Sequence, residues 1–159
     1  DGVLYWNDMM KFKLPRRSLI ALSLCASSMS LVWAQADFAQ QAAKEPGARV
    51  TASGLVFKSL QDGQGASPLA SDKVKVHYRG TLPDGKEFDS SFKRNQPIDF
   101  PLNAVIPCWT EGVQLMKVGG KAKLTCPPAI AYGSRGAGGV IPPNATLQFE
   151  VELIAIAGK

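Results

Sequence analysis

Histidine and cysteine are scarce in this 159-residue sequence, which has one histidine, His77, and three cysteines. Structural and catalytic metal sites need paired Cys and His ligands. Cys108 and Cys126 stand 18 positions apart with no second ligand beside either. No nucleophile motif accompanies His77, which lies between Lys75 and Arg79 on the polar side of a predicted strand. We therefore expect no metal and no cofactor, and we interpret His77 as a surface residue.

Clustered charge of one sign is also absent. The sequence has 18 Lys and Arg residues against 13 Asp and Glu residues, a net charge of +5. Residues 1–36 hold four of the basic and two of the acidic residues, and the remaining excess is scattered along predicted strands and loops. A nucleic-acid-binding surface requires basic residues gathered on one face. We therefore expect no nucleic-acid partner.

No hydrophobic run is long enough to cross a membrane. The apolar stretch from Leu19 to Val32 is interrupted by serines and is shorter than the roughly 20 residues that a membrane helix requires. The basic stretch from Lys11 to Arg17 precedes it, and Ala34-Gln35-Ala36 follows it. This order is typical of a secretory signal peptide. We predict export, to the bacterial periplasm, with cleavage near Ala36 and no stable membrane insertion afterwards.

Two alternatives for the first 36 residues are less favoured. One is a retained membrane anchor, and the other is a lipoprotein processed at Cys25. Leu24, before that cysteine, is bulkier than the small residue that such processing sites usually carry. We interpret the residues before Met10 as upstream sequence.

Residues 37–51 are interpreted as a flexible N-terminal arm ahead of a domain over residues 52–159. The arm is polar and rich in Ala and Gln, with a Pro-Gly pair at 46–47, which indicates a mobile segment or a frayed helix. It has no heptad pattern that would form a dimerising coiled coil. We expect a monomer.

The domain shows the two-residue alternation of half-buried strands. The alternating apolar positions are Val74, Val76 and Tyr78; Ala122, Leu124 and Cys126; and Leu147, Phe149, Val151 and Leu153. One short helix is predicted from Pro107, because proline is favoured in the first helical turn, and its apolar face carries Trp109, Val113 and Met116. Several strands with one helix predict an α+β fold.

A 19-residue stretch, 127–145, connects two of these strands and is rich in proline and glycine. Loops of this length inside a compact domain are usually functional. The aromatic residues are also distributed unusually. Beyond residue 36, Trp109 is the only tryptophan, and Tyr78 and Tyr132 are the only tyrosines. Trp109 in the first turn of the helix is placed to form the floor of a cavity, although a purely structural role in the core also accounts for the aromatics.

Five motifs make the sequence resemble FKBP-type peptidyl-prolyl isomerases, and they occur in the order found in that family. They are Val76-His-Tyr-Arg-Gly-Thr-Leu82, Asp84-Gly-Lys-Glu-Phe-Asp-Ser-Ser91, Val105-Ile-Pro-Cys-Trp-Thr-Glu-Gly112, Ala131-Tyr-Gly133 and Ile141-Pro-Pro-Asn-Ala-Thr-Leu147. The resemblance covers about residues 52–157. It implies an antiparallel sheet of five or six strands wrapped around one short helix.

The resemblance also implies a set of site residues. The pocket would be lined by Tyr78, Phe88, Asp89, Val105, Ile106, Trp109, Tyr132 and Phe149. Within this set, the catalytic residues would be Asp89, Ile106, Trp109, Tyr132 and Phe149. Arg94 resembles the basic partner of Asp89 and Tyr78, and Val140 and Ile141 resemble loop residues that flank the bound proline. Ala137 stands where some relatives carry a larger side chain. This difference bears on how far the loop reaches over the substrate, and therefore on which substrate sequences are preferred, but not on the reaction.

By this resemblance the protein would accelerate rotation about the bond preceding proline, without a cofactor. Its partners would be proline-containing polypeptides, with FK506- and rapamycin-type macrolides as inhibitors. The main competing hypothesis is a chaperone that binds proline-containing segments without significant turnover. A third hypothesis, a surface adhesin, is supported only by the predicted export. Cys108 and Cys126 would face each other between helix and sheet, either as a disulfide or as two buried free thiols.

Overall fold

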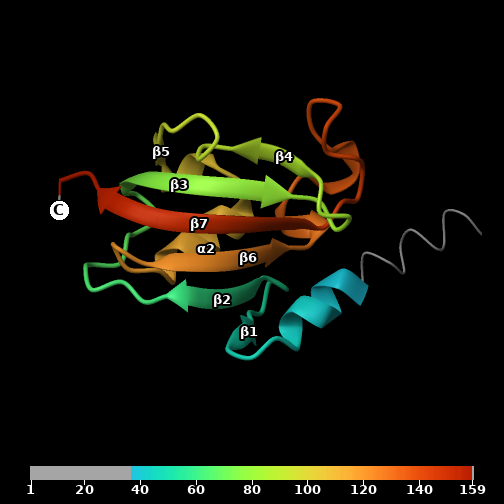
Figure 1. The fold of residues 1–159 in the computed structure, drawn as a ribbon, viewed down its shortest axis with the longest axis horizontal. Helices are drawn as coiled ribbons and strands as arrows, with labels where there is room; N and C mark the ends of the chain where they lie inside the picture. Colours follow the sequence, from blue (N-terminus) through green and yellow to red (C-terminus); the bar gives the residue numbers. More distant parts are fainter. Residues whose placement is uncertain (1–36, 159) are drawn as a thin grey trace, which may run out of the picture. The chain divides into compact units, whose positions relative to one another are not determined.

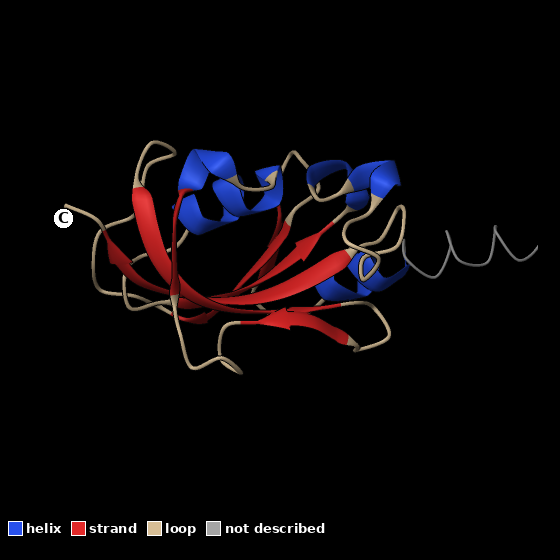
Figure 2. Ribbon diagram, turned by 90° about the horizontal axis from the view of Figure 1, so that it is seen from above, coloured by secondary structure: helices blue, strands red, loops and turns tan. Residues whose placement is uncertain are grey.

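The computed structural model describes residues 37–158, in which one antiparallel sheet of seven strands curves around helix α2 (Figures 1 and 2). The strand order is β1-β2-β6-β7-β3-β4, and β5 also pairs with β3. The strands are β1 (Ala48–Val50), β2 (Val56–Gln61), β3 (Lys73–Thr81), β4 (Glu87–Ser90), β5 (Ile98–Pro101), β6 (Lys121–Cys126) and β7 (Leu147–Ile156). The α+β prediction is confirmed, with β1 as an additional edge strand.

The long central strands follow from their alternating side chains. In β3, the apolar residues Val74, Val76 and Tyr78 are buried and the residues between them are exposed or half-buried. β7 shows the same alternation, and β3 pairs with it so that Tyr78 lies opposite Val151. Because alternate residues point to opposite faces of a sheet, the apolar face of both strands turns toward α2.

Helix α2 (Pro107–Gln114) lies along the concave side of the sheet (Figure 2). It begins with proline, as predicted, and it buries Cys108, Trp109 and Val113. Gly112 allows the helix to approach β6 closely, because a Cβ atom at this position would lie 2.8 Å from the Leu124 side chain. The helix is therefore packed directly on the strand that precedes the long loop.

The Cys108–Cys126 pair forms a disulfide bond in the structure, with a Cα–Cα distance of 5.8 Å. Both residues are fully buried in the hydrophobic core. The sequence leaves a disulfide and two free thiols open as alternatives, and the structure contains the disulfide.

The segment that the sequence indicates as a mobile arm or frayed helix is ordered into two elements. Residues 37–43 are helical, and β1 adds to the edge of the sheet beside β2 (Figure 1). Between these elements, the Glu45 carboxylate accepts hydrogen bonds from Lys58 at 2.9 Å and from Lys123 at 2.6 Å. These partners lie 13 and 78 positions away in the chain, so local sequence patterns carry no signal for the contact.

The long loop at 127–145 contains regular structure. It includes two short 3-10 helices, Pro128–Ile130 and Gly133–Arg135. A tight turn follows, in which Ala137 and Ile141 exchange two backbone hydrogen bonds of 3.0 Å. The loop that the sequence indicates as functional therefore contains local structure, and it carries Tyr132 to the cavity described below.

The predicted signal peptide, residues 1–36, lies outside the described residues. Within the described part of the chain, no helix combines the length and the hydrophobicity needed to cross a membrane.

Candidate active site

A cavity of about 550 Å³ opens beside the first turn of α2. Its walls come from β3, β4, β5, the start of α2, the long loop and β7. The residues that line it are Tyr78, Phe88, Asp89, Ile98, Phe100, Ala104, Val105, Ile106, Trp109, Tyr132 and Phe149. The structure thus brings together all eight residues that the resemblance places in the pocket wall.

Trp109 is the centre of an aromatic cluster in this cavity. Its ring centroid lies 5.3 Å from Tyr78, 5.2 Å from Phe149 and 5.4 Å from Phe100, and the first two contacts are edge-to-face. Aromatic pairs prefer such offset or T-shaped geometries at centroid separations of about 4.5–7 Å. Trp109 is 5% exposed, so its indole forms a fixed apolar floor.

The indole nitrogen of Trp109 has no hydrogen-bond partner among residues 37–158. Among the described residues, every other buried side-chain nitrogen or oxygen atom has a hydrogen-bond partner. The orientation of the indole is therefore set by ring packing and by the backbone of the first helical turn.

Gly80 makes the aromatic wall possible; it lies within the first sequence motif, but the sequence alone assigns it no role. A Cβ atom at this position would lie 2.4 Å from the Phe88 ring and 2.9 Å from the Phe149 ring. These rings make an edge-to-face contact with centroids 5.6 Å apart. Only glycine at position 80 leaves room for both rings at this point of β3.

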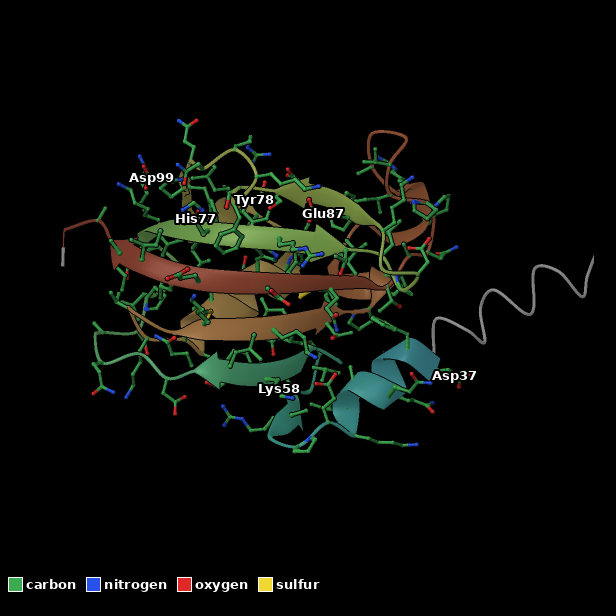
Figure 3. All side chains as sticks on the ribbon, in the orientation of Figure 1. Asp37, Lys58, His77, Tyr78, Glu87 and Asp99 are labelled. Carbon is green, nitrogen blue, oxygen red and sulfur yellow. A yellow bond between two sulfur atoms is a disulfide. The ribbon has the colours of Figure 1, made fainter. Side chains whose placement is uncertain are left out.

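One edge of the cavity carries a polar group of three side chains. The Tyr78 hydroxyl donates a hydrogen bond to the Asp89 carboxylate. Arg94 donates to both, from Nη1 to Asp89 at 2.6 Å and from Nη2 to the Tyr78 hydroxyl oxygen at 3.0 Å. The backbone N–H of Ser90 donates to Asp89 at 2.9 Å. Tyr78, labelled in Figure 3, comes from β3, while Asp89 comes from the neighbouring β4.

These contacts keep Asp89 ionised. Burial favours the neutral acid, but the hydrogen bonds from Tyr78 and Arg94 and the positive charge of Arg94 together hold the pKa of Asp89 below its ordinary value. Burial, followed by the hydrogen bond to Asp89, raises the pKa of Tyr78. Near neutral pH the cavity edge therefore carries a carboxylate and a neutral phenol.

Two hydrogen-bond donors at the cavity remain unused. The backbone N–H of Ile106, at the N-cap of α2, makes no hydrogen bond to another residue in the described part of the chain. The Tyr132 side chain is 40% exposed, and its hydroxyl likewise has no partner among residues 37–158. Both groups are available to a ligand.

Three residues implied by the resemblance lie outside the cavity wall. Arg94 contacts the cavity wall through its hydrogen bonds to Asp89 and Tyr78. Ile141 is 6% exposed and packs in the core, and Val140 is 49% exposed on the turn that follows Ala137. The structure therefore does not bring Val140 and Ile141 to the lining of the cavity.

Three lining residues were not predicted, namely Ile98, Phe100 and Ala104. Ile98 and Phe100 are two positions apart on the four-residue strand β5, so their alternation was a usable but weak signal. Ala104 ends a short 3-10 helix at Leu102–Ala104, and no sequence pattern marks it.

His77 lies on the polar side of β3, as predicted, next to Tyr78 in Figure 3. Its Nδ1 atom is 2.9 Å from the Ser91 hydroxyl, and its ring stacks on Phe92 at 4.8 Å. Among the described residues, no group of three or more His, Cys, Asp or Glu side chains is arranged to hold a metal ion.

The sequence profile of the FKBP-type peptidyl-prolyl cis-trans isomerases matches residues 65–154. Together with the sheet wrapped around α2 and the aromatic cavity, this match shows that the chain belongs to the FKBP-type peptidyl-prolyl cis-trans isomerase family.

Individual members of the family share about half of the aligned positions. The FKBP-type peptidyl-prolyl cis-trans isomerase FkpA of Escherichia coli (strain K12) is 49% identical over 120 residues, which are 76% of this chain and 44% of that protein. FkpA of Aeromonas hydrophila is 58% identical over 114 residues, 72% of this chain and 42% of that protein. The chain thus spans about half the length, or less, of these relatives.

Solved structures agree in fold. A peptidyl-prolyl cis-trans isomerase from Pseudomonas syringae pv. tomato superposes with a TM-score of 0.75 at 40% identity, covering 81% of this chain and 95% of that one. FkpA from Escherichia coli superposes with a TM-score of 0.73 at 41% identity, covering 91% of this chain and 74% of that one.

Proposed function

We propose that this chain accelerates cis–trans rotation about the peptide bond that precedes proline. The observation that carries the proposal is the shared cavity of Trp109 and Phe149, whose rings meet edge-to-face at 5.2 Å and border a hollow of about 550 Å³. A hollow of this size with apolar rings accepts a proline ring and its neighbours. Membership of the FKBP-type isomerase family supports the same activity.

The catalytic effect follows from the electronic structure of the amide. Rotation about a peptide bond faces a barrier of about 18–20 kcal/mol because the planar amide is stabilised by resonance. The twisted amide has less charge separation than the planar one. A pocket poor in water therefore disfavours the planar ground state more than the twisted transition state, and this difference accelerates rotation.

The polar groups of the cavity would orient the substrate. The free N–H of Ile106 and the hydroxyl of Tyr132 would donate hydrogen bonds to substrate carbonyls, which holds the prolyl bond over Trp109. Asp89, kept ionised by Tyr78 and Arg94, would lie against the rotating carbonyl. Val140 and Ile141 lie outside the cavity lining, so they would flank only a part of the substrate that extends beyond the cavity. No proton transfer and no covalent intermediate are involved.

The substrates that we propose are proline-containing segments of exported polypeptides. FK506- and rapamycin-type macrolides would compete for the same cavity. A proline-binding chaperone without significant turnover would use the same residues, so only a rate measurement separates it from an isomerase.

The deciding experiment measures isomerisation of a short X–Pro peptide by the wild-type chain and by the Trp109→Ala/Phe149→Ala variant. We expect catalysis by the wild type and a fall in kcat/KM of at least about 100-fold in the variant, because the apolar walls that hold the ring are lost. Circular dichroism checks that the variant is folded. Wild-type binding of the peptide without acceleration would support the chaperone instead, and equal rates for the two proteins would remove the enzyme proposal.

A further inference from the structure

The buried disulfide ties together the two elements that frame the floor of the cavity. Cys108 lies in the first turn of α2, directly before Trp109. Cys126 is the last residue of β6 and directly precedes the loop that carries Tyr132. The bond therefore links the segment that holds the indole to the segment that leads to the opposite wall.

The first turn of α2 has few other fixed attachments. Its N-cap makes no side-chain hydrogen bond, and no acidic residue in the first turn interacts with the helix dipole. Side-chain caps normally stabilise the start of a helix, and α2 lacks one. At eight residues, the helix is also shorter than the roughly 12–15 residues below which isolated helices are marginal.

Side-chain hydrogen bonds of α2 start at Thr110, the residue after Trp109. The Thr110 hydroxyl donates to the Leu102 carbonyl at 2.8 Å, and Glu111 accepts a hydrogen bond from Ser53. The indole N–H of Trp109 has no partner among the described residues. Consequently, the position of the indole depends on ring packing, on the Thr110 hydrogen bond that follows it and on the covalent bond made by the preceding residue.

We propose that Cys108 and Cys126 act as positioning residues for the proline cavity, because their bond holds Trp109 and the Ile106 N–H in the geometry that a ligand requires. This inference rests on the proposed function and adds a residue pair that acts through its neighbours, without touching the substrate. Both cysteines are 0% exposed and absent from the cavity lining.

The proposal predicts a specific kinetic signature. Without the bond, the start of α2 samples positions in which the cavity is not assembled, and apparent affinity falls by the fraction of assembled molecules. We therefore expect KM for an X–Pro peptide and the Kd for a macrolide of the FK506 type to rise together by about fivefold. kcat, which reports on the bound and assembled state, should change by less than about twofold.

The test uses residues 37–159 with the disulfide formed, the same protein kept reduced by a thiol reductant, and the Cys108→Ala/Cys126→Val variant. Alanine suits a helix and valine a strand, so this variant retains local structure preferences. Leu153→Ala is the matched control, because Leu153 is 0% exposed on β7 and lines no part of the cavity. Unfolding temperatures confirm that each protein is folded at the assay temperature.

The proposal is supported if KM and Kd rise in the reduced protein and in the double variant, return when the reduced protein is reoxidised, and remain unchanged in Leu153→Ala. Equal KM values with and without the bond would overturn it, as would an equal rise in Leu153→Ala, since that result would assign the effect to general destabilisation. An oxidised wild type that binds macrolide without catalysis would instead contradict the proposed function, and the Kd comparison would still decide the role of the bond.

Discussion

At the scale of single residues, the polar edge of the cavity is a case in which neighbours fix a charge state. The carboxylate of Asp89 is stabilised by Tyr78 and Arg94 against the opposing effect of burial. The interaction favours the ionised form in the folded protein, so the stability it contributes is fully present above the unfolded pKa of about 3.9. It is lost as the pH falls through the lower, folded pKa.

The Tyr78→Phe variant tests this coupling. Removal of the hydroxyl donor should raise the pKa of Asp89 toward its ordinary value, which an NMR titration of the carboxyl carbon measures directly.

Between about pH 6 and 8, kcat/KM of the wild type should stay nearly flat, because Asp89 remains ionised and Tyr78 neutral throughout. A steep bell in that range would contradict the mechanism without proton transfer.

A second prediction concerns Gly80. The Gly80→Ala substitution places a methyl group into the Phe88 and Phe149 rings, and overpacking of this kind costs about 1–3 kcal/mol of stability. We expect a fall of kcat/KM by at least about tenfold because the aromatic wall must shift. Denaturant unfolding and the peptide assay measure the two effects.

Gly85→Ala is the matched control for that substitution. Gly85 has φ +86, and a Cβ atom added there would meet no other atom within 4 Å, so the cost of the substitution comes from backbone strain of about 1–2 kcal/mol. Gly85→Ala should lose stability while kcat/KM stays at the wild-type value. Equal losses of activity in the two variants would show that Gly80 acts through stability alone.

At the scale of elements, predictability depended on length and on alternation. β3 and β7 have nine and ten residues, so their two-residue pattern repeats often enough to identify them. β1 has three residues and was missed, because an edge strand of this length is defined by its pairing with β2. Ile98 and Phe100 were missed as cavity residues for a related reason, since β5 is short and its role depends on pairing with β3.

The N-terminal elements provide the third prediction. Glu45→Gln removes the ion pairs to Lys58 and Lys123, and we expect a loss of about 0.5–1 kcal/mol at pH 7, the range for partly exposed pairs. Lys123 and then Lys58 lower the pKa of Glu45, so this contribution is present above the unfolded pKa of about 4.3 and disappears on acidification.

Denaturant unfolding of wild type and Glu45→Gln at pH 7 and pH 3 measures this difference. The two proteins should differ at pH 7 and become similar at pH 3. kcat/KM at pH 7 should be unchanged, because none of the three residues lines the cavity. A difference in stability that persists at pH 3 would show that the ion pairs are not its source.

At the scale of the whole molecule, the family fold could be predicted because five motifs occur in the correct order. The site was largely predictable for the same reason, since eight of the eleven lining residues lie within or beside those motifs. The Cys108–Cys126 disulfide was one of two alternatives that the sequence left open. The Glu45 contacts, by contrast, join residues 13 and 78 positions apart, and only the folded chain brings them together. The predicted signal peptide, the cleavage site and the monomeric state remain predictions.

Ligand binding gives the fourth prediction, at this same scale. A macrolide that binds only the folded state raises stability by about 2.7 kcal/mol when its free concentration is 100 times Kd. Thermal unfolding of residues 37–159 should therefore shift upward with FK506 concentration. The Trp109→Ala/Phe149→Ala protein serves as the control and should show no shift; a shift of equal size would place the binding site elsewhere.

The position of Trp109 at the floor of the cavity has a practical consequence for optical spectroscopy. Trp109 is the single tryptophan of residues 37–159, and it forms the floor on which a ligand would rest. Emission from a rigid chromophore in apolar surroundings responds to whatever covers it, so intrinsic fluorescence of this segment reports occupancy without any attached dye. One cuvette titration can thus follow the proline cavity alone.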